Sequence, residues 1–184
     1  MTPGIGHNNG PTLDRGRAWR TYAWRKARAD LLPQLPLEVV RIRVKRAKAL
    51  GLPYKTYAGI RASTGHDLVG FLFSSNALGV FRPGDRAPVF VTTKLDSLQA
   101  CQRVGLAHRR VDLRSITALD QVASAPHPHL SWSDTKGHLK EIIRLTGKPS
   151  DRFVLVGETM FERDWAEAAQ TAGYLTGAHY FAQG

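Results

Sequence analysis

Polar side chains follow three apolar runs of the sequence, each at the point where a predicted strand ends. Because the carboxyl ends of parallel strands meet at one edge of a sheet, where ligands of open α/β folds bind, we expect these side chains to gather at one site. The three groups are Ser74-Ser75-Asn76 after the run Leu68 to Phe73, Thr92-Thr93-Lys94 after Pro88 to Val91, and Gly157-Glu158-Thr159 after Phe153 to Val156.

The elements that must position these groups alternate between strand and helix. Short apolar runs predict strands buried on both faces, so the alternation predicts an α/β fold: a mostly parallel, Rossmann-like sheet flanked by helices and preceded by a basic helical N-terminal segment. The predicted helices are Leu95 to Val104, Ser115 to Ala123, a segment capped by Ser131 or Ser133 that ends at about Thr146, and Glu162 to Ala172. Two shorter strands are expected at Arg110 to Leu113 and, at the sheet edge, His179 to Ala182.

Three regions of the chain are predicted from composition. Residues 1–13 are rich in Gly, Pro and Asn and are expected to form a mobile tail. Residues 14–66 form a basic helical segment that starts with a predicted helix, Asp14 to Leu32. Residues 67–184 form the α/β domain.

Three segments, FLFSSNAL, VFVTTKLDSLQACQRVGL and GKPSDRFVLVGETMFERDWAEAAQTAGY, are similar in order to the four-motif layout of the haloacid dehalogenase-like superfamily. The similarity extends from Leu68 to Tyr174. Members of this family transfer phosphoryl groups through an aspartate nucleophile. The resemblance places Ser74 at the nucleophile position and Asn76 at the position of the acid/base aspartate.

The resemblance also assigns binding roles. It aligns Thr92 with the phosphate-binding Ser or Thr and Lys148 with the family's lysine, and it gives Glu158 and Glu162 the spacing of the acids that hold Mg²⁺. A serine without a neighbouring base cannot replace the attacking carboxylate, and an asparagine cannot carry a proton. We therefore expect a non-catalytic relative without a cofactor; the alternative is a metal-dependent phosphohydrolase that uses Mg²⁺.

Positive charge is concentrated at the start of the chain. The net charge is +11, and residues 1–62 hold 13 Lys and Arg against 3 Asp and Glu, whereas residues 63–184 hold 13 against 12. An excess so localised favours a polyanion such as DNA or RNA. The alternative is a protein-interaction module that docks an acidic protein partner.

A basic helix is predicted over the segment that begins at Leu37. Arg41, Lys45 and Lys48 recur at helical spacing beside an apolar stripe, although Val40 to Lys45 also alternates as a strand would. We favour the helix because good helix formers continue it to Leu50.

A second helix is predicted to follow the first. Pro53 ends the basic helix, and the next helix, Tyr54 to about Arg61, precedes Gly65; the pair resembles a helix-turn-helix element. The predicted phosphate contacts are Arg41, Arg43, Lys45, Arg46, Lys48, Lys55 and Arg61.

The single cysteine, Cys101, excludes an intramolecular disulfide and favours a cytoplasmic location. No apolar run is long enough to span a membrane. The sequence as a whole predicts a nucleic-acid-binding protein with a basic helical region on a non-catalytic α/β domain.

Overall fold

The computed structural model of the chain describes residues 35–182. The predicted tail at residues 1–13 and the predicted helix from Asp14 to Leu32 lie outside the described residues. The boundary predicted between residues 66 and 67 stays a prediction.

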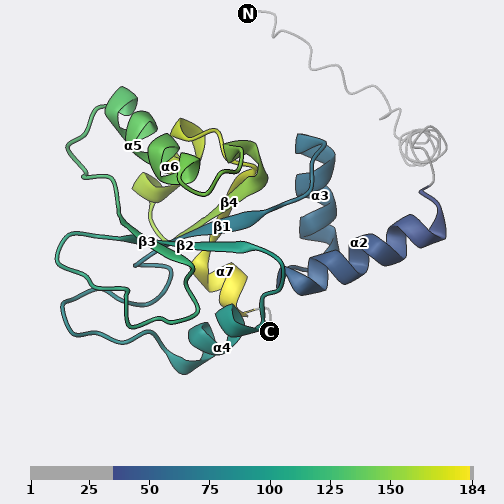
Figure 1. Cartoon of the computed structure of the whole chain (residues 1–184), viewed down its shortest axis with the longest axis horizontal. Helices are drawn as coiled ribbons and strands as arrows, with labels where there is room; N and C mark the ends of the chain where they lie inside the picture. Colours follow the sequence, from purple (N-terminus) through teal and green to yellow (C-terminus); the bar gives the residue numbers. More distant parts are fainter. Residues whose placement is uncertain (1–34, 183–184) are drawn as a thin grey trace, which may run out of the picture. The chain divides into compact units, whose positions relative to one another are not determined.

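A sheet of five parallel strands, in the order β3-β2-β1-β4-β5, forms the centre of the fold (Figure 1). This confirms the predicted α/β, Rossmann-like architecture. The direction of strand succession reverses between β1 and β4, so the carboxyl ends of these strands flank the crevice where such folds bind ligands. The strands are β1 Gly70–Ser74, β2 Gln102–Ala107, β3 Gln121–Ser124, β4 Phe153–Gly157 and β5 Gly173–Thr176.

Helices cover both faces of the sheet. In Figure 1, α5 and α6 lie over one face, and α4 and α7 lie over the other. The helices are α2 Leu37–Ala49, α3 Tyr54–Thr64, α4 Val89–Ser97, α5 Trp132–Arg144, α6 Met160–Ala168 and α7 Gly177–Ala182, with a 3₁₀ turn η2 at Ser150–Arg152.

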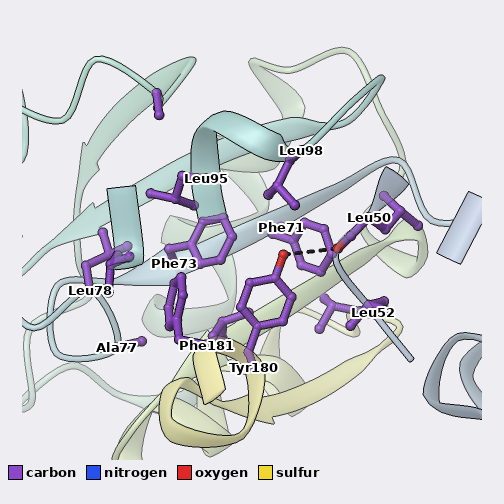
Figure 2. Packing of buried hydrophobic residues seen from close by; sticks show 14 of the residues in the cluster. Leu50, Leu52, Phe71, Phe73, Ala77, Leu78, Leu95, Leu98, Tyr180 and Phe181 are labelled. Atoms are coloured by element: carbon purple, nitrogen blue, oxygen red, sulfur yellow. Dashed lines mark hydrogen bonds between the residues drawn. The ribbon is translucent and has the colours of Figure 1, made fainter. Parts of the chain in front are cut away.

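Alternation along β1 divides the core into two layers. Phe71 and Phe73 point to one face and pack with the ring of Tyr180 (Figure 2). Leu72 points to the other face and packs in a second cluster with Leu139 of α5. Successive side chains of a strand point to opposite faces, so a fully apolar strand can supply both layers. The Tyr180 hydroxyl donates to the Leu50 carbonyl at 3.1 Å, which satisfies two buried polar groups.

The prediction of a strand at Pro88 to Val91 is wrong. Residues Val89–Ser97 form α4, which begins after Pro88. Its buried residues are Val91, Lys94 and Leu95, a spacing that belongs to a helix face. Burial of this face outweighs the strand propensity of the β-branched residues.

The second strand of the chain therefore lies later than expected. β2 occupies Gln102–Ala107, where the sequence analysis predicted a helix from Leu95 to Val104. The strand predicted at Arg110 to Leu113 and the helix predicted at Ser115 to Ala123 are also wrong, because turns occupy residues 108–120 and β3 follows them.

The C-terminal end of the described chain also differs from the prediction. β5 at Gly173–Thr176 was missed, and His179 to Ala182, predicted as an edge strand, belong to α7. Tyr180 and Phe181 are buried there beneath the sheet. The helices predicted after Ser131 and around Glu162 are confirmed as α5 and α6.

The basic helix and its successor are confirmed as α2 and α3. Gly65 ends α3 in the left-handed conformation, at φ 76°, which a glycine adopts without a steric penalty. The strand alternative at Val40 to Lys45 is thereby excluded.

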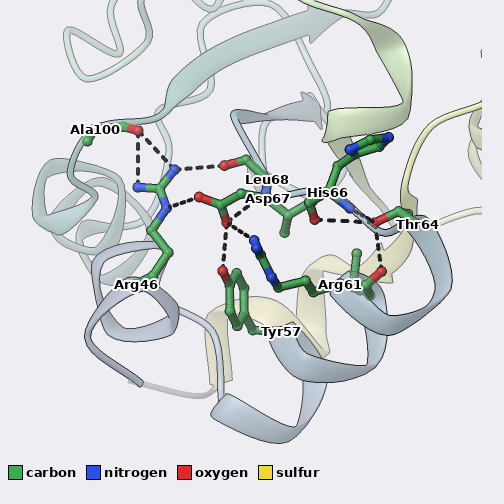
Figure 3. A network of polar contacts seen from close by, with 9 residues as sticks. Arg46, Tyr57, Arg61, Thr64, His66, Asp67, Leu68 and Ala100 are labelled. Atoms are coloured by element: carbon green, nitrogen blue, oxygen red, sulfur yellow. Dashed lines mark hydrogen bonds and ion pairs between the residues drawn. The ribbon is translucent and has the colours of Figure 1, made fainter. Parts of the chain in front are cut away.

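A polar network joins α2 and α3 to the start of β1 (Figure 3). The Arg46 guanidinium donates to Asp67 at 3.0 Å and to the carbonyls of Leu68 at 2.7 Å and Ala100 at 3.2 Å. The Tyr57 hydroxyl donates to the other oxygen of Asp67 at 2.7 Å. This network fixes both helices at the amino edge of the sheet.

None of the helices between residues 35 and 182 is long and apolar enough to cross a bilayer.

We predict that Arg46→Ala lowers the free energy of unfolding by about 1.5–3 kcal/mol, because a charged donor is lost and Asp67 is left half-buried beside fewer donors. Arg46→Lys should recover only part of the lost stability, since one ammonium group cannot donate at once to the three acceptors that surround the planar guanidinium. Urea unfolding measures both effects. The exposed neighbour Lys45 is the control: Lys45→Ala should change stability by less than about 0.5 kcal/mol. Equal effects of the Arg46→Ala and Lys45→Ala substitutions would contradict this role.

Candidate functional site

A buried carboxylate, that of Glu162, lies at the carboxyl edge of the sheet. Glu162 is fully buried, and its Oε2 accepts the backbone N–H groups of Glu158 at 2.6 Å and Thr159 at 2.8 Å. The Thr159 hydroxyl accepts the N–H of Glu162 at 3.3 Å, which completes a capping box at the start of α6. Gly157 permits this approach, because a Cβ there would lie 2.8 Å from the Cβ of Glu162.

The second oxygen of Glu162 joins the ends of two other strands. Its Oε1 accepts from Asn76 Nδ2 at 3.0 Å and lies 3.5 Å from His108 Nε2. His108 directly follows β2, and its Nδ1 lies 2.8 Å from Ser75 Oγ. With the ring proton on Nε2, Nδ1 accepts from the Ser75 hydroxyl and the Nε2–H group faces the Glu162 carboxylate, so the three side chains line up as a Ser75–His108–Glu162 chain.

The pKa of His108 is lowered from its ordinary value of 6.5, mainly by burial, which outweighs the opposing effect of the Glu162 charge. The imidazole is therefore neutral at pH 7 and offers one donor and one acceptor. Its ring lies 5.4 Å from that of Trp165 on α6. This contact fixes the ring plane at the mouth of the crevice.

The structure places Ser74 and Asn76 at the carboxyl edge of β1, as predicted, but neither offers a free reactive group. Ser74 is fully buried, and its hydroxyl accepts the N–H of Ala77 at 3.1 Å. The Asn76 amide donates to Glu162. Both side chains stabilise the turn after β1 and the capped end of α6.

The residues predicted for phosphate binding are not brought together. Thr92 lies on α4, where its hydroxyl donates to the Val89 carbonyl at 3.0 Å, rather than at a strand end. Lys148 is exposed and precedes η2 and β4, so it lies toward the amino edge, away from Ser74.

Mg²⁺ does not fit the two glutamates. N–H donors occupy both oxygens of Glu162, and an oxygen of Glu158 accepts the N–H of Ala178 at 3.3 Å. No group of three His, Cys, Asp or Glu side chains within residues 35–182 is arranged to hold a metal ion.

Burial also shifts the pKa values of Cys101 and Lys94. Burial raises the pKa of the Cys101 thiol to about 11, so it is not a thiolate nucleophile at neutral pH. Burial also lowers the pKa of Lys94, whose ammonium donates to the Tyr180 carbonyl and lies over the Tyr180 ring.

Two hollows adjoin His108 at the carboxyl edge. One, of about 340 Å³, is lined by Trp132, Phe161 and Trp165 together with the polar side chains of Asn76 and His108. The other, of about 630 Å³, is lined by the basic side chains of Arg109 and Arg110, by His108 and His127, and by apolar residues that include Val111 and Pro126. Both volumes fall in the range of small-molecule sites.

His108, Arg109 and Arg110 were not predicted as site residues, because the second strand was predicted at the wrong place in the sequence. The signal that could have found them is the run Arg103 to Ala107, in which Val104 and Leu106 alternate around Gly105, followed by His-Arg-Arg. Recognition of that run as a strand would have placed these three residues at the carboxyl edge.

The predicted phosphate contacts lie on α2 and α3 with unequal exposure. Lys45, Lys48 and Lys55 are exposed, and within residues 35–182 their ammonium groups have no hydrogen bond or ion pair. Arg46 is engaged in the internal network, and Arg61 lies 3.7 Å from Asp67. Arg43 is half-buried and Arg41 is exposed.

The chain matches no family model, and searches of curated proteins and of solved structures return no match.

We predict that His108 makes stability depend on pH. The unfolded chain protonates this residue near pH 6.5, whereas the folded protein protonates it only at lower pH. The unfolded state therefore binds more protons in this interval, and stability falls as the pH drops through 6.5 towards the folded pKa. Urea unfolding at about pH 7.5 and about pH 5.5 should show that the free energy of unfolding falls more between these two pH values for the wild type than for His108→Gln. His129→Gln, at an exposed histidine, should behave as the wild type; equal losses in all three proteins would contradict the prediction.

We also predict that the α/β domain does not hydrolyse phosphate esters, because no carboxylate occupies the positions of Ser74 and Asn76. An assay of the purified protein against phosphomonoesters with Mg²⁺ should stay at background. Turnover that both Ser74→Ala and Glu158→Ala abolish would contradict this prediction.

Proposed function

We propose that this protein binds nucleic acid, DNA or RNA, through the exposed cations of α2 and α3. The observation that carries the proposal is charge: residues 41–62 hold 7 Lys and Arg and no Asp or Glu. Lysines that lie on a helix surface without protein partners neutralise phosphates and release counterions.

Burial and exposure on α2 support a preformed cationic surface. Ala47 and Leu50 are buried in the core, while Lys45 and Lys48, three residues apart, are exposed. The Arg46 network holds the helix in place without using these ammonium groups. The phosphate-binding surface therefore needs no ordering of its backbone on binding, which favours affinity.

The α/β domain serves in this proposal as a rigid base. Leu68, whose carbonyl accepts from Arg46, lies two residues before β1, so the cationic helices lie at the amino edge of the sheet. The Ser75–His108–Glu162 chain lies at the opposite edge. Nucleic acid bound to α2 and α3 would leave that edge open.

A second candidate function, docking of an acidic protein, is favoured by the apolar exposure of α2. Ile42 is 67% exposed and Val44 is 46% exposed. Their exposure favours docking because the centre of a protein interface usually buries such apolar side chains. An Ile42→Gln substitution separates the two functions, because it removes an apolar anchor and keeps every charge.

We predict that affinity for a short nucleic-acid duplex falls steeply with salt, with a log-log slope of about 0.9 per phosphate contact. Lys45→Ala/Lys48→Ala should weaken binding and reduce this slope by about two, as measured by fluorescence anisotropy. Ile42→Gln should leave nucleic-acid affinity unchanged.

The matched control is Arg82→Ala/Arg86→Ala, which removes two exposed charges outside α2 and α3. If the control weakens binding as much as the lysine variant, attraction is due to net charge alone and the proposed surface is wrong. Affinity that does not change with salt would remove the proposal altogether. The ultraviolet absorbance ratio of the purified protein reports nucleic acid that is carried along with it. A ratio that falls after a high-salt wash would support the proposal.

A further inference from the structure

The two hollows beside His108 differ in chemistry but adjoin each other. His108, His127 and Pro128 line both, so the hollows meet at these residues. On one side lie the rings of Trp132, Phe161 and Trp165; on the other lie Arg109 and Arg110. A ligand that spans both would place a planar ring on the first side and an anionic group on the second.

The aromatic side is open to a ligand. Trp132 is 54% exposed and Phe161 66% exposed, whereas Trp165 is buried beneath the ring of His108. Exposed aromatic side chains around a hollow stack well with a nucleobase, because every base presents a π-face. Asn76 and His108 offer polar groups at the same wall.

The basic side carries two cations, Arg109 and Arg110. Within residues 35–182, no hydrogen bond or ion pair occupies the guanidinium of Arg109 or Arg110. The backbone of Arg110 also adopts φ 70°, a left-handed conformation that residues other than glycine seldom adopt. Such conformations are enriched at functional sites. Both arginines line this hollow, and a guanidinium can bind a phosphate through paired N–H donors.

We propose that the carboxyl edge of the sheet binds a mononucleotide, with the base among Trp132, Phe161 and Trp165 and the phosphate at Arg109 and Arg110. The sugar then lies beside His108 and His127, where the hollows meet. The imidazole of His108, whose two nitrogens face Ser75 and Glu162, is neutral and therefore does not repel the neighbouring arginines. This site is separate from the nucleic-acid surface of α2 and α3 and extends the proposed function.

Calorimetric titration of the full chain with AMP, adenosine and inorganic phosphate tests the proposal. AMP should bind saturably, and adenosine, which lacks the phosphate, should bind at least about tenfold more weakly. Inorganic phosphate should bind more weakly than AMP, because it lacks the base. GMP, CMP and UMP extend the test to the other bases.

Surface variants separate the two halves of the site. Arg109→Ala/Arg110→Ala should lower AMP affinity about tenfold or more and leave adenosine affinity unchanged. Trp132→Ala should weaken both ligands by about tenfold. All three residues are partly or fully exposed, so these variants are expected to fold, and an unchanged thermal transition verifies this.

The controls distinguish this site from the surface of α2 and α3. Arg82→Ala/Arg86→Ala and Lys45→Ala/Lys48→Ala should keep wild-type AMP affinity, and the Arg109 and Trp132 variants should keep duplex affinity. The proposal is overturned if none of the four mononucleotides binds saturably. It is also overturned if AMP binding survives both the Trp132 and the Arg109/Arg110 changes, or if it is lost in the Lys45/Lys48 variant instead.

Discussion

The buried carboxylate of Glu162 is the interaction on which the carboxyl edge depends. A fully buried charge is costly unless several donors surround it. Here two backbone N–H groups at the start of α6, the Asn76 amide and the His108 ring supply that surrounding. One side chain thereby fixes the ends of β1, β2 and β4 relative to α6, and the crevice beside His108 has its shape for this reason.

The sequence was sufficient for the elements whose pattern is unambiguous. The apolar runs at β1 and β4 and the serine cap of α5 predict strands and a helix, and the structure confirms them. The α2–α3 pair was predicted from helical spacing and from Pro53 and Gly65. In each case, local propensity and burial favour the same structure.

Prediction failed where propensity and burial disagree. The segment Val89 to Thr93 has the composition of a strand. In α4, however, the buried residues are Val91, Lys94 and Leu95, which lie on one helix face, so packing selects a helix. This one error displaced β2 and concealed His108. The crevice beside His108 also depends on contacts between residues that are far apart in the sequence: Asn76 and Glu162 are 86 residues apart, and no spacing rule joins them.

The two edges of the sheet differ in the charge and shape of their surfaces. The amino edge carries α2 and α3, whose lysines are exposed while Arg46 and Asp67 hold the backbone. The carboxyl edge carries a neutral histidine between an aromatic hollow and a basic hollow. A long polyanion needs an open cationic surface, whereas a small ligand needs a concave site with convergent groups, and the two edges meet these separate requirements.

The central claim is that polyanions bind at the amino edge and leave the carboxyl edge free. Backbone amide NMR spectra of the protein, recorded during titration with a short nucleic-acid duplex, test it most directly, because the bases of a duplex are stacked and cannot enter the aromatic hollow. The account predicts shift changes at Lys45, Lys48 and Lys55 and none at His108 or Trp165. Changes at His108 and Trp165 with none on α2 and α3 would contradict it.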